Sequence, residues 1–168
     1  MRLALALVCA ALISAGPARA AERPALASER SDKIEIVARI REAVDACNRH
    51  EVTALTGYLM PLPIVMDQVP PYQFQGQFQG THAFPGWETS YDADSRADSR
   101  KNAITEPEIT LLRVKDIEIT GTHAYVVWPA AYGFKQAGKH SEHYSTITVA
   151  LEKSGRDWRI TTWILNME

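Results

Sequence analysis

The C-terminal part of the chain alternates between apolar and polar residues in four runs, which tight turns separate. The runs are residues 108–120, 123–135, 143–153 and 158–166. A glycine lies in each of the three breaks, at Gly121, Gly138 and Gly155. Alternation with a period of two is typical of half-buried β-strands, and glycine is typical of the turns that join them. The pattern therefore predicts an antiparallel meander.

The first of these runs loses its alternation near the middle. Leu111 and Ile117 share one parity, whereas Leu112 and Val114 carry apolar side chains on the other. A β-bulge or a strong bend shifts the alternation in this way. A sheet that curls around an interior needs such a device, so we expect a bend in this strand.

The N-terminal half follows the spacing of helices instead. A helix is predicted to begin at Asp32, with Glu35 as the partner of a capping box. Its apolar residues recur every three or four positions, at Ile34, Val37, Ile40, Val44 and Cys47. A shorter helix over 51–59, a strand over 62–67 and a third helix over 79–91 complete the prediction. Helices followed by antiparallel strands are typical of the α+β class.

The chain opens with a charged residue, then an apolar run, then small residues. Arg2 precedes the apolar residues 3–13, and Ala18-Arg19-Ala20 has the pattern of a cleavage site. This order is typical of a secretory signal peptide, because the apolar run is too short to span a membrane. We therefore expect a secreted or periplasmic protein with three parts: a signal peptide over 1–20, a flexible arm over 21–31 and a single α+β domain over 32–168.

Charge and cysteine content restrict the classes of function. The chain has 18 basic and 20 acidic residues, and loss of Arg2 and Arg19 makes it more acidic. No basic run stands out, so neither nucleic acid nor, after cleavage, a membrane is an expected partner. Cys47 is the one cysteine after residue 20, so no internal disulfide is expected. Its place on the apolar stripe of a helix indicates a buried, inert thiol.

Two short duplications lie in the middle of the chain. QFQG occurs at 73–76 and 77–80, and ADSR occurs at 93–96 and 97–100. Four residues are too few for a structural repeat. Surface loops tolerate such insertions, because the entropy of loop closure grows slowly with length. We therefore interpret both duplications as loop expansions and expect residues 93–102 to be mobile.

The order of several motifs resembles the nuclear transport factor 2-like superfamily, in particular its SnoaL-like and ketosteroid isomerase-like branches. The motifs are ACNRHEVTALTGYLMPLPIVMD over 46–67, followed by PPYQFQG, TGTHAYVVW and TVALEKSGRDWRITTW. The resemblance implies a cone-shaped, strongly curved and mostly antiparallel sheet wrapped around the N-terminal helices. It also implies a pocket between helices and sheet, and a homodimer through the sheet. This architecture serves isomerases, cyclases, dehydratases, binding modules and assembly domains, so the fold does not decide the function.

Asp67 is the strongest candidate for chemistry. It ends the predicted strand over 62–67, and its place relative to Asn48 matches that of the general base in the ketosteroid isomerase-like branch. Such a base abstracts a proton next to a carbonyl group. The alternative is that Asp67 starts the turn towards Pro70, a position where aspartate is favoured.

The oxyanion donors of that branch are missing from this chain. The resemblance calls for a tyrosine where Ala43 stands and for a second acid within residues 143–151, which contain none. Without these donors an enolate loses its largest stabilising interaction, so steroid isomerase activity is not expected. SnoaL-like cyclases depend mainly on one acid/base residue and remain compatible with the sequence.

A histidine and a set of aromatic residues complete the candidate site. His143 either faces the pocket and shares a proton with Asp67, or lies at a strand edge in water. His140 is three residues away on the same predicted strand, so the two rings point to opposite faces and no metal site is expected. Aromatic side chains supply apolar lining, and the candidates are Tyr58, Trp87, Tyr91, Trp128 and Trp163.

The sequence thus predicts an exported domain that binds a small apolar or aromatic molecule without a cofactor. Two alternatives stay open. One is a cofactor-free acid/base cyclase, isomerase or dehydratase that uses Asp67, with His143 or Tyr58. The other is a non-catalytic, dimeric assembly module. The place of the Asp67 carboxylate relative to the interior distinguishes among them.

Overall fold

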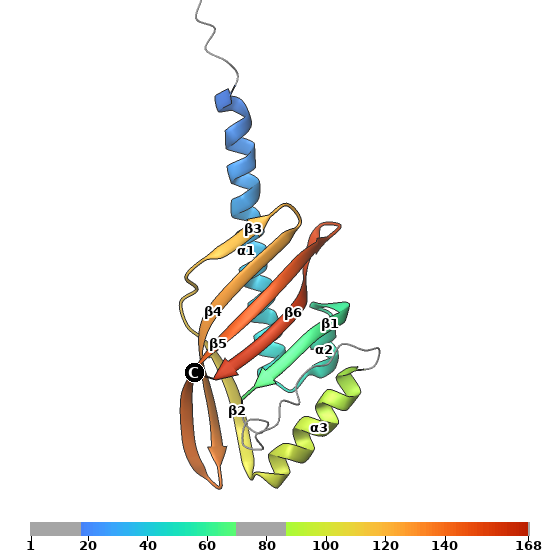
Figure 1. Ribbon diagram of the computed structural model, residues 1–168, viewed down its shortest axis with the longest axis vertical. Helices are drawn as coiled ribbons and strands as arrows, with labels where there is room; N and C mark the ends of the chain where they lie inside the picture. The colour runs from blue at the N-terminus through green and yellow to red at the C-terminus, as the bar shows by residue number, and fades with distance from the viewer. Residues whose placement is uncertain (1–17, 70–86, 168) are drawn as a thin grey trace, which may run out of the picture.

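The computed structural model describes residues 18–69 and 87–167, shown as a ribbon in Figure 1. The elements in chain order are α1 (Ala18–Asn48), α2 (Val52–Thr56), β1 (Leu59–Gln68), α3 (Trp87–Lys101), β2 (Ile104–Leu111), β3 (Ile117–Thr120), β4 (His123–Gln136), β5 (Lys139–Ser154) and β6 (Asp157–Met167). The predicted α+β class is confirmed. Each of the alternating C-terminal runs is a strand, or a pair of strands in the case of the first run.

The described strands form one curled sheet with the order β1-β6-β5-β4-β2, and β3 pairs with β4 as well. β1 runs parallel to β6, and the other pairs are antiparallel. The hairpin between β4 and β5 turns at Ala137 and Gly138, whose φ angles of 49° and 80° are both positive. Two consecutive residues of this kind match the right-handed twist of paired strands, which explains the glycine at this position.

The expected bend in the first alternating run is present. Residues 112–116 lie outside any strand and separate β2 from β3. The bend is held by β4, because the Leu112 amide donates to the Pro129 carbonyl (3.0 Å) and the Trp128 indole donates to the Leu112 carbonyl (2.8 Å). The shift in alternation at Leu112 therefore marks the end of β2. After the bend, the chain pairs with β4 again as β3.

The apolar core lies between α1 and the inner face of the sheet. Alternate residues of β4 (124–134) and β5 (145–151) are buried on this face. In Figure 1, α1 passes behind the sheet, and its N-terminal half projects beyond it. The buried stripe of α1 begins at Ile36, whereas Ile34, which the helical spacing placed on the apolar face, is 63% exposed. Ile34 lies where the helix is leaving the sheet.

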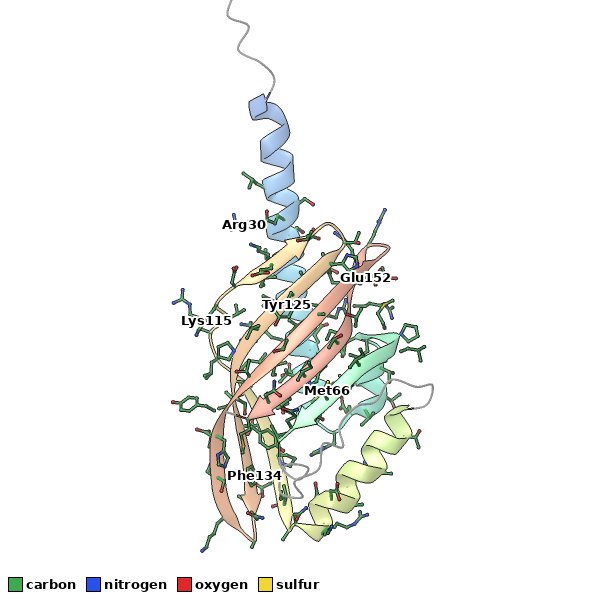
Figure 2. All side chains as sticks on the ribbon, viewed as in Figure 1. Arg30, Met66, Lys115, Tyr125, Phe134 and Glu152 are labelled. Atoms are coloured by element: carbon green, nitrogen blue, oxygen red, sulfur yellow. The ribbon has the colours of Figure 1, made fainter. Side chains whose placement is uncertain are left out.

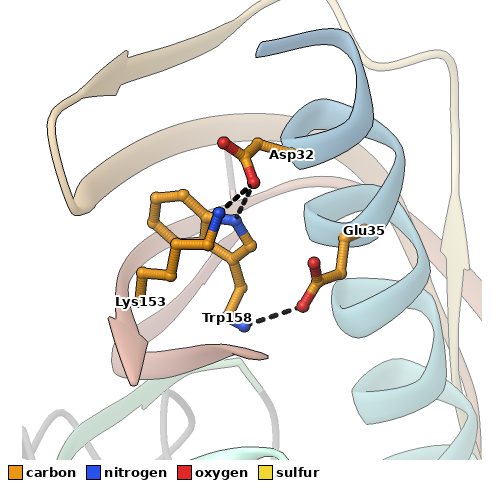
Figure 3. Close-up of polar contacts among 4 residues, drawn as sticks. All are labelled: Asp32, Glu35, Lys153 and Trp158. Carbon is orange, nitrogen blue, oxygen red and sulfur yellow. Dashed lines mark hydrogen bonds and ion pairs between the residues drawn. The ribbon is translucent and has the colours of Figure 1, made fainter. Parts of the chain in front are cut away.

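The expected start of the first helix at Asp32 is wrong, because α1 begins at Ala18 and includes the segment 21–31. That segment is rich in alanine, the strongest helix former. The carboxylates of Asp32 and Glu35, expected to cap the helix, bind the hairpin between β5 and β6 instead (Figure 3). Their partners are 121 or more residues away in sequence, so local spacing could not distinguish the two roles.

The expected mobile loop over 93–102 is also wrong, because both ADSR copies lie in α3. One copy adds four residues, close to the 3.6 residues of a helical turn, so a duplication keeps each residue type near the same face. α3 ends at Lys101, and the Asn102 side chain donates to the Asp98 carbonyl over 2.9 Å. The QFQG copies lie outside the described residues. Neither described range contains a helix long and apolar enough to cross a membrane.

Candidate functional site

Asp67 lies near the end of β1 and faces the interior. It alternates with Val65 on the buried side of the strand, and only 5% of the residue is exposed. The strand register places Asp67 beside Leu165 of β6, and Leu165 beside Ile147 of β5. Trp128 of β4 continues this row. Asp67 is therefore the one acidic member of an otherwise apolar row that crosses four of the described strands.

The end of α1 lies near Asp67. Burial, together with the nearby charge of Asp67, raises the pKa of the Cys47 thiol to about 12. The thiol is protonated at neutral pH, which agrees with the expected inert cysteine and argues against a nucleophile. Asn48 fixes this end of α1 to β2, because its side chain donates to the Ile109 carbonyl (2.9 Å) and accepts from the Ile109 amide (2.8 Å).

Ser145 is the other polar residue that is buried within the described parts of the chain. It is 2% exposed and lies on the inner face of β5, two residues before Ile147. Its neighbours across the sheet are Ala130 and Met167. Within residues 18–69 and 87–167, its Oγ atom has no hydrogen-bond partner. Sequence reasoning missed Ser145, because serine in an alternating strand gives no signal until the surroundings of its hydroxyl are known.

His143 and Asp67 do not lie together. His143 is exposed, pairs with Tyr132 across the strands, and stacks on Phe134 with 5.7 Å between ring centroids. Ile147 of β5 is level with Asp67. His143 lies four residues from Ile147, which is about 13 Å along the strand. No cluster of three or more potential metal ligands occurs in the two described ranges.

The aromatic candidates fall into three groups. Trp128 and Trp163, at 0% and 4% exposure, belong to the inner face. Trp163 lies beside Val65 of β1, whereas Trp128 is three strands away from Asp67. Tyr58 lies just before β1, at the end opposite Asp67, where the Arg39 guanidinium is 5.5 Å from the ring centroid. Trp87 and Tyr91 belong to α3, but their side chains lie outside the described part of the structure.

The outer face of the sheet carries exposed apolar side chains. Tyr125 (47% exposed) and Val127 (41%) lie on β4, and Tyr144 (73%) lies on β5. Figure 2 shows Tyr125 and Met66 on the face turned away from α1. A hollow of about 260 Å³ opens on this face beside Tyr125 and Pro129. Exposed apolar residues grouped on one face are typical of a surface that binds another protein.

A second apolar surface lies along the projecting half of α1. Leu26 (61% exposed) and Ile34 border a groove of about 420 Å³ that Val37 and Ile117 complete. A more polar hollow of about 530 Å³ lies between α2 and α3, beside His50. Among the residues whose side chains the structure describes, none of those predicted as site residues lines these surface hollows.

No protein-family model and no curated protein matches the sequence. Many solved structures share its fold. A nuclear transport factor 2-like protein with a cystatin-like fold from Novosphingobium aromaticivorans is 13% identical, with a TM-score of 0.60 over 92% of this chain and 91% of that protein. A scytalone dehydratase-like protein of the same bacterium is 9% identical, with a TM-score of 0.62 over 85% of this chain and 88% of that protein.

The association domain of CaMKII from Caenorhabditis elegans is 15% identical, with a TM-score of 0.56 over 83% of this chain and 98% of that domain. Identities this low carry the fold and not the function. In this chain, the curled mixed sheet and the N-terminal helix across its inner face fit that fold. The chain has the nuclear transport factor 2-like fold, as the order of its sequence motifs predicts.

Proposed function

We propose that the chain is a small-molecule-binding domain whose ligand lies on the inner face of the sheet, beside Asp67. The burial of this carboxylate among apolar residues supports the proposal. A buried carboxylate is costly, and such groups are concentrated at functional sites. The row that Asp67 ends consists of Leu165, Ile147 and Trp128, so the ligand is mostly apolar with one polar group that reaches Asp67.

Calorimetric binding of 2-naphthol tests this proposal. The probe combines an apolar two-ring body with one hydroxyl group. We expect the wild type to bind it and Asp67→Asn to bind it about 3- to 10-fold more weakly, the effect of one hydrogen bond. Asp157→Asn is the matched control, because Asp157 is an exposed aspartate at the start of β6. A wild type that does not bind, or equal affinity in both variants, contradicts the proposal.

An acid/base enzyme is the second candidate, because the same carboxylate is the residue that such chemistry requires. The scytalone dehydratase-like neighbour shows that a protein named for such a reaction has this fold. His143 and Tyr58 lie away from Asp67, so Asp67 would act as base without either. Exchange of the α-protons of 2-tetralone in D₂O, followed by NMR, tests this. The enzyme hypothesis requires acceleration by the wild type and none by Asp67→Asn.

We also propose that the outer face of the sheet joins two copies of the chain. The exposed Tyr125, Val127 and Tyr144 support this, and the CaMKII neighbour is itself named an association domain. Pairing of two such faces is isologous, so every contact occurs twice. Assembly through this face does not involve the inner face.

Export is the last part of the proposal, supported by the signal-peptide pattern of residues 1–20. Expression of the full chain in a bacterial host, followed by N-terminal sequencing of the periplasmic fraction, tests it. We expect the mature protein to begin at Ala21. Retention of Met1 in soluble protein inside the cell contradicts export.

A further inference from the structure

The hollow between α2 and α3 has the size and the lining of a site for a small polar molecule. Its volume of about 530 Å³ lies within the range of small-molecule sites. Val52 and Ala54 give it an apolar side. Asp67 and the apolar row beside it do not line the hollow, so it is distinct from the inner face. The residues that bring side-chain hydrogen-bond donors to it are His50, Thr53, Thr89 and Arg96.

His50 has a backbone conformation that favours glycine. Its φ angle is 55°, just after the last turn of α1. The His50 amide donates to the Cys47 carbonyl and the Glu51 amide donates to the Ala46 carbonyl, both over 2.9 Å. These two bonds form the Schellman motif, in which glycine is the usual residue at the position of His50. Strained residues are concentrated at functional sites, and this one lines the hollow.

Arg96 belongs to the first of the two ADSR copies. Arg100 is the same residue of the second copy, one helical turn further along α3, and it does not line the hollow. A guanidinium has five N–H donors in a planar fork that matches the oxygen atoms of a carboxylate or a phosphate. Arg96 can therefore hold oxygen atoms of a ligand in addition to a partner within the chain.

Glu51 is the acidic residue among those that line the hollow. Its Oε2 atom lies 2.9 Å from Nη2 of Arg49, so its charge is compensated by a neighbouring guanidinium. The hydroxyl groups of Thr53 and Thr89 are neutral and can donate to an anionic oxygen. The donors on the two helices therefore suit an anion better than a cation.

We propose that the hollow between α2 and α3 binds a small organic anion. Arg96 binds the carboxylate or phosphate group of this ligand, with His50 and the two threonine hydroxyls as further donors. The apolar part of the ligand lies against Val52 and Ala54 of α2. This site is separate from the one proposed beside Asp67, so either proposal can fail without the other.

Three probes and the ADSR duplication test this inference. Phenyl phosphate and benzoate carry the two kinds of anionic group on the same ring, and benzyl alcohol is their neutral analogue. The test variant is Arg96→Gln. The matched control is Arg100→Gln, because both arginines are exposed and lie on the same helix. Affinities are measured from amide chemical shifts of the ¹⁵N-labelled protein at low ionic strength, where exposed charges are screened least.

We expect the wild type to bind at least one of the two anions, with the largest shifts at residues 50–54 and 89–96. Benzyl alcohol should bind at least about 10-fold more weakly. Arg96→Gln should weaken binding of the anion about 3- to 10-fold, because a charge-assisted hydrogen bond is lost, whereas Arg100→Gln should change it less than about 2-fold. The anion that binds more tightly identifies the ligand group as phosphate or carboxylate.

A glycine variant separates the role of His50 in binding from its role in the fold. His50→Gly should raise the melting temperature by about 2–4 °C, because glycine adopts a positive φ without strain. The same variant should bind the anion about 3-fold more weakly. Ala137→Gly is the matched control, since Ala137 also has a positive φ, of 49°, in the hairpin between β4 and β5. It should change the affinity less than about 2-fold.

Four results overturn the inference. The first is that neither anion shifts the residues around the hollow. The second is an equal loss of affinity in Arg96→Gln and Arg100→Gln, which indicates attraction to surface charge rather than a site. The third is that benzyl alcohol binds as tightly as the anions. The fourth is unchanged affinity in His50→Gly. If 2-naphthol shifts the inner face while the anions shift nothing at the hollow, this inference fails and the proposed function stands.

Discussion

The indole N–H of Trp158 donates a hydrogen bond of 3.1 Å to Asp32 Oδ1 and so connects the middle of α1 to the hairpin between β5 and β6 (Figure 3). Lys153 Nζ lies 2.5 Å from the same oxygen. Glu35 accepts from the Trp158 backbone amide over 2.9 Å. Because Trp158 is fully buried, these bonds fix where α1 crosses the sheet.

We expect Asp32→Ala to lower the free energy of unfolding by about 1–2 kcal/mol, the effect of losing hydrogen bonds to a charged group. Ser31→Ala, one residue earlier and exposed, is the control. Urea unfolding followed by fluorescence measures both. An Asp32→Ala variant as stable as the Ser31→Ala variant would show that the contact contributes nothing.

The same contact predicts a pH dependence. The hydrogen bond from Lys153 lowers the pKa of Asp32 below its ordinary value of 3.8, with further lowering by Trp158 and opposition from burial. The ionised Asp32 carboxylate therefore stabilises the fold above about pH 4. This stabilisation is lost as the pH falls through the lowered pKa. The stability difference between wild type and Asp32→Asn should shrink as the pH falls below 4. A difference that stays constant from pH 7 to pH 2 contradicts the assignment.

Ionisation of Cys47 predicts the opposite pH dependence of stability, with stability lost as the pH rises into the alkaline range. Its thiol ionises near pH 9 when unfolded, but burial and the charge of Asp67 hold the folded pKa at about 12. The contribution of the neutral thiol to the free energy of unfolding is fully present below pH 9. It is lost as the pH rises from 9 to 12. The difference between wild type and Cys47→Ala should therefore decline over this range, by up to about 1.4 kcal/mol per pH unit. A flat difference from pH 8 to pH 11 would mean that the thiol is accessible.

Removal of one ADSR copy, residues 97–100, is expected to shorten α3. Deletion from a surface loop would change stability little, but this segment is helical. Loss of four residues rotates the C-terminal end of the helix by about 40° and removes about 6 Å of its length. Far-UV circular dichroism should show less helix, and the urea midpoint should fall. Replacement of the same four residues by alanine keeps the length and should preserve both. Unchanged helix content after deletion would restore the loop interpretation.

Charge introduced on the outer face of the sheet tests the proposed dimer. Val127→Lys should convert a dimer to a monomer in sedimentation equilibrium, because a charge at the centre of an apolar interface is left without a partner. Leu26→Lys is the control, since Leu26 is a similarly exposed apolar residue on the projecting half of α1. Dissociation by Leu26→Lys, with Val127→Lys still dimeric, would move the interface from the sheet to α1.

The sheet was predictable from the sequence because its strands are half-buried. Alternation located β4, β5 and β6 within a few residues, and the lost alternation at Leu112 located the bend between β2 and β3. The helices were harder to predict. Asp32 and Glu35 look like a helix cap in sequence, yet their partners lie in the last hairpin. Such contacts depend on the fold and have no local signal.

The candidate site was predictable in part. The inward orientation of Asp67 follows from the parity of its strand, and the half-buried position of Cys47 follows from the helical stripe. The distance between His143 and Asp67 depends on the register of three strands, which sequence does not provide. Ser145 is identified only by the lack of a partner within the described chain, which is a property of the folded environment.

If the proposed function is right, the inner face beside Asp67 binds a small molecule. The most direct measurement is titration of ¹⁵N-labelled protein with 2-naphthol, followed by amide chemical shifts. We expect the largest changes at inner-face positions on three strands and at the end of α1, namely Cys47, Val65, Asp67, Ser145, Ile147 and Leu165. Changes confined to the outer face around Tyr125, or to the groove around Leu26 and Ile34, would contradict the claim.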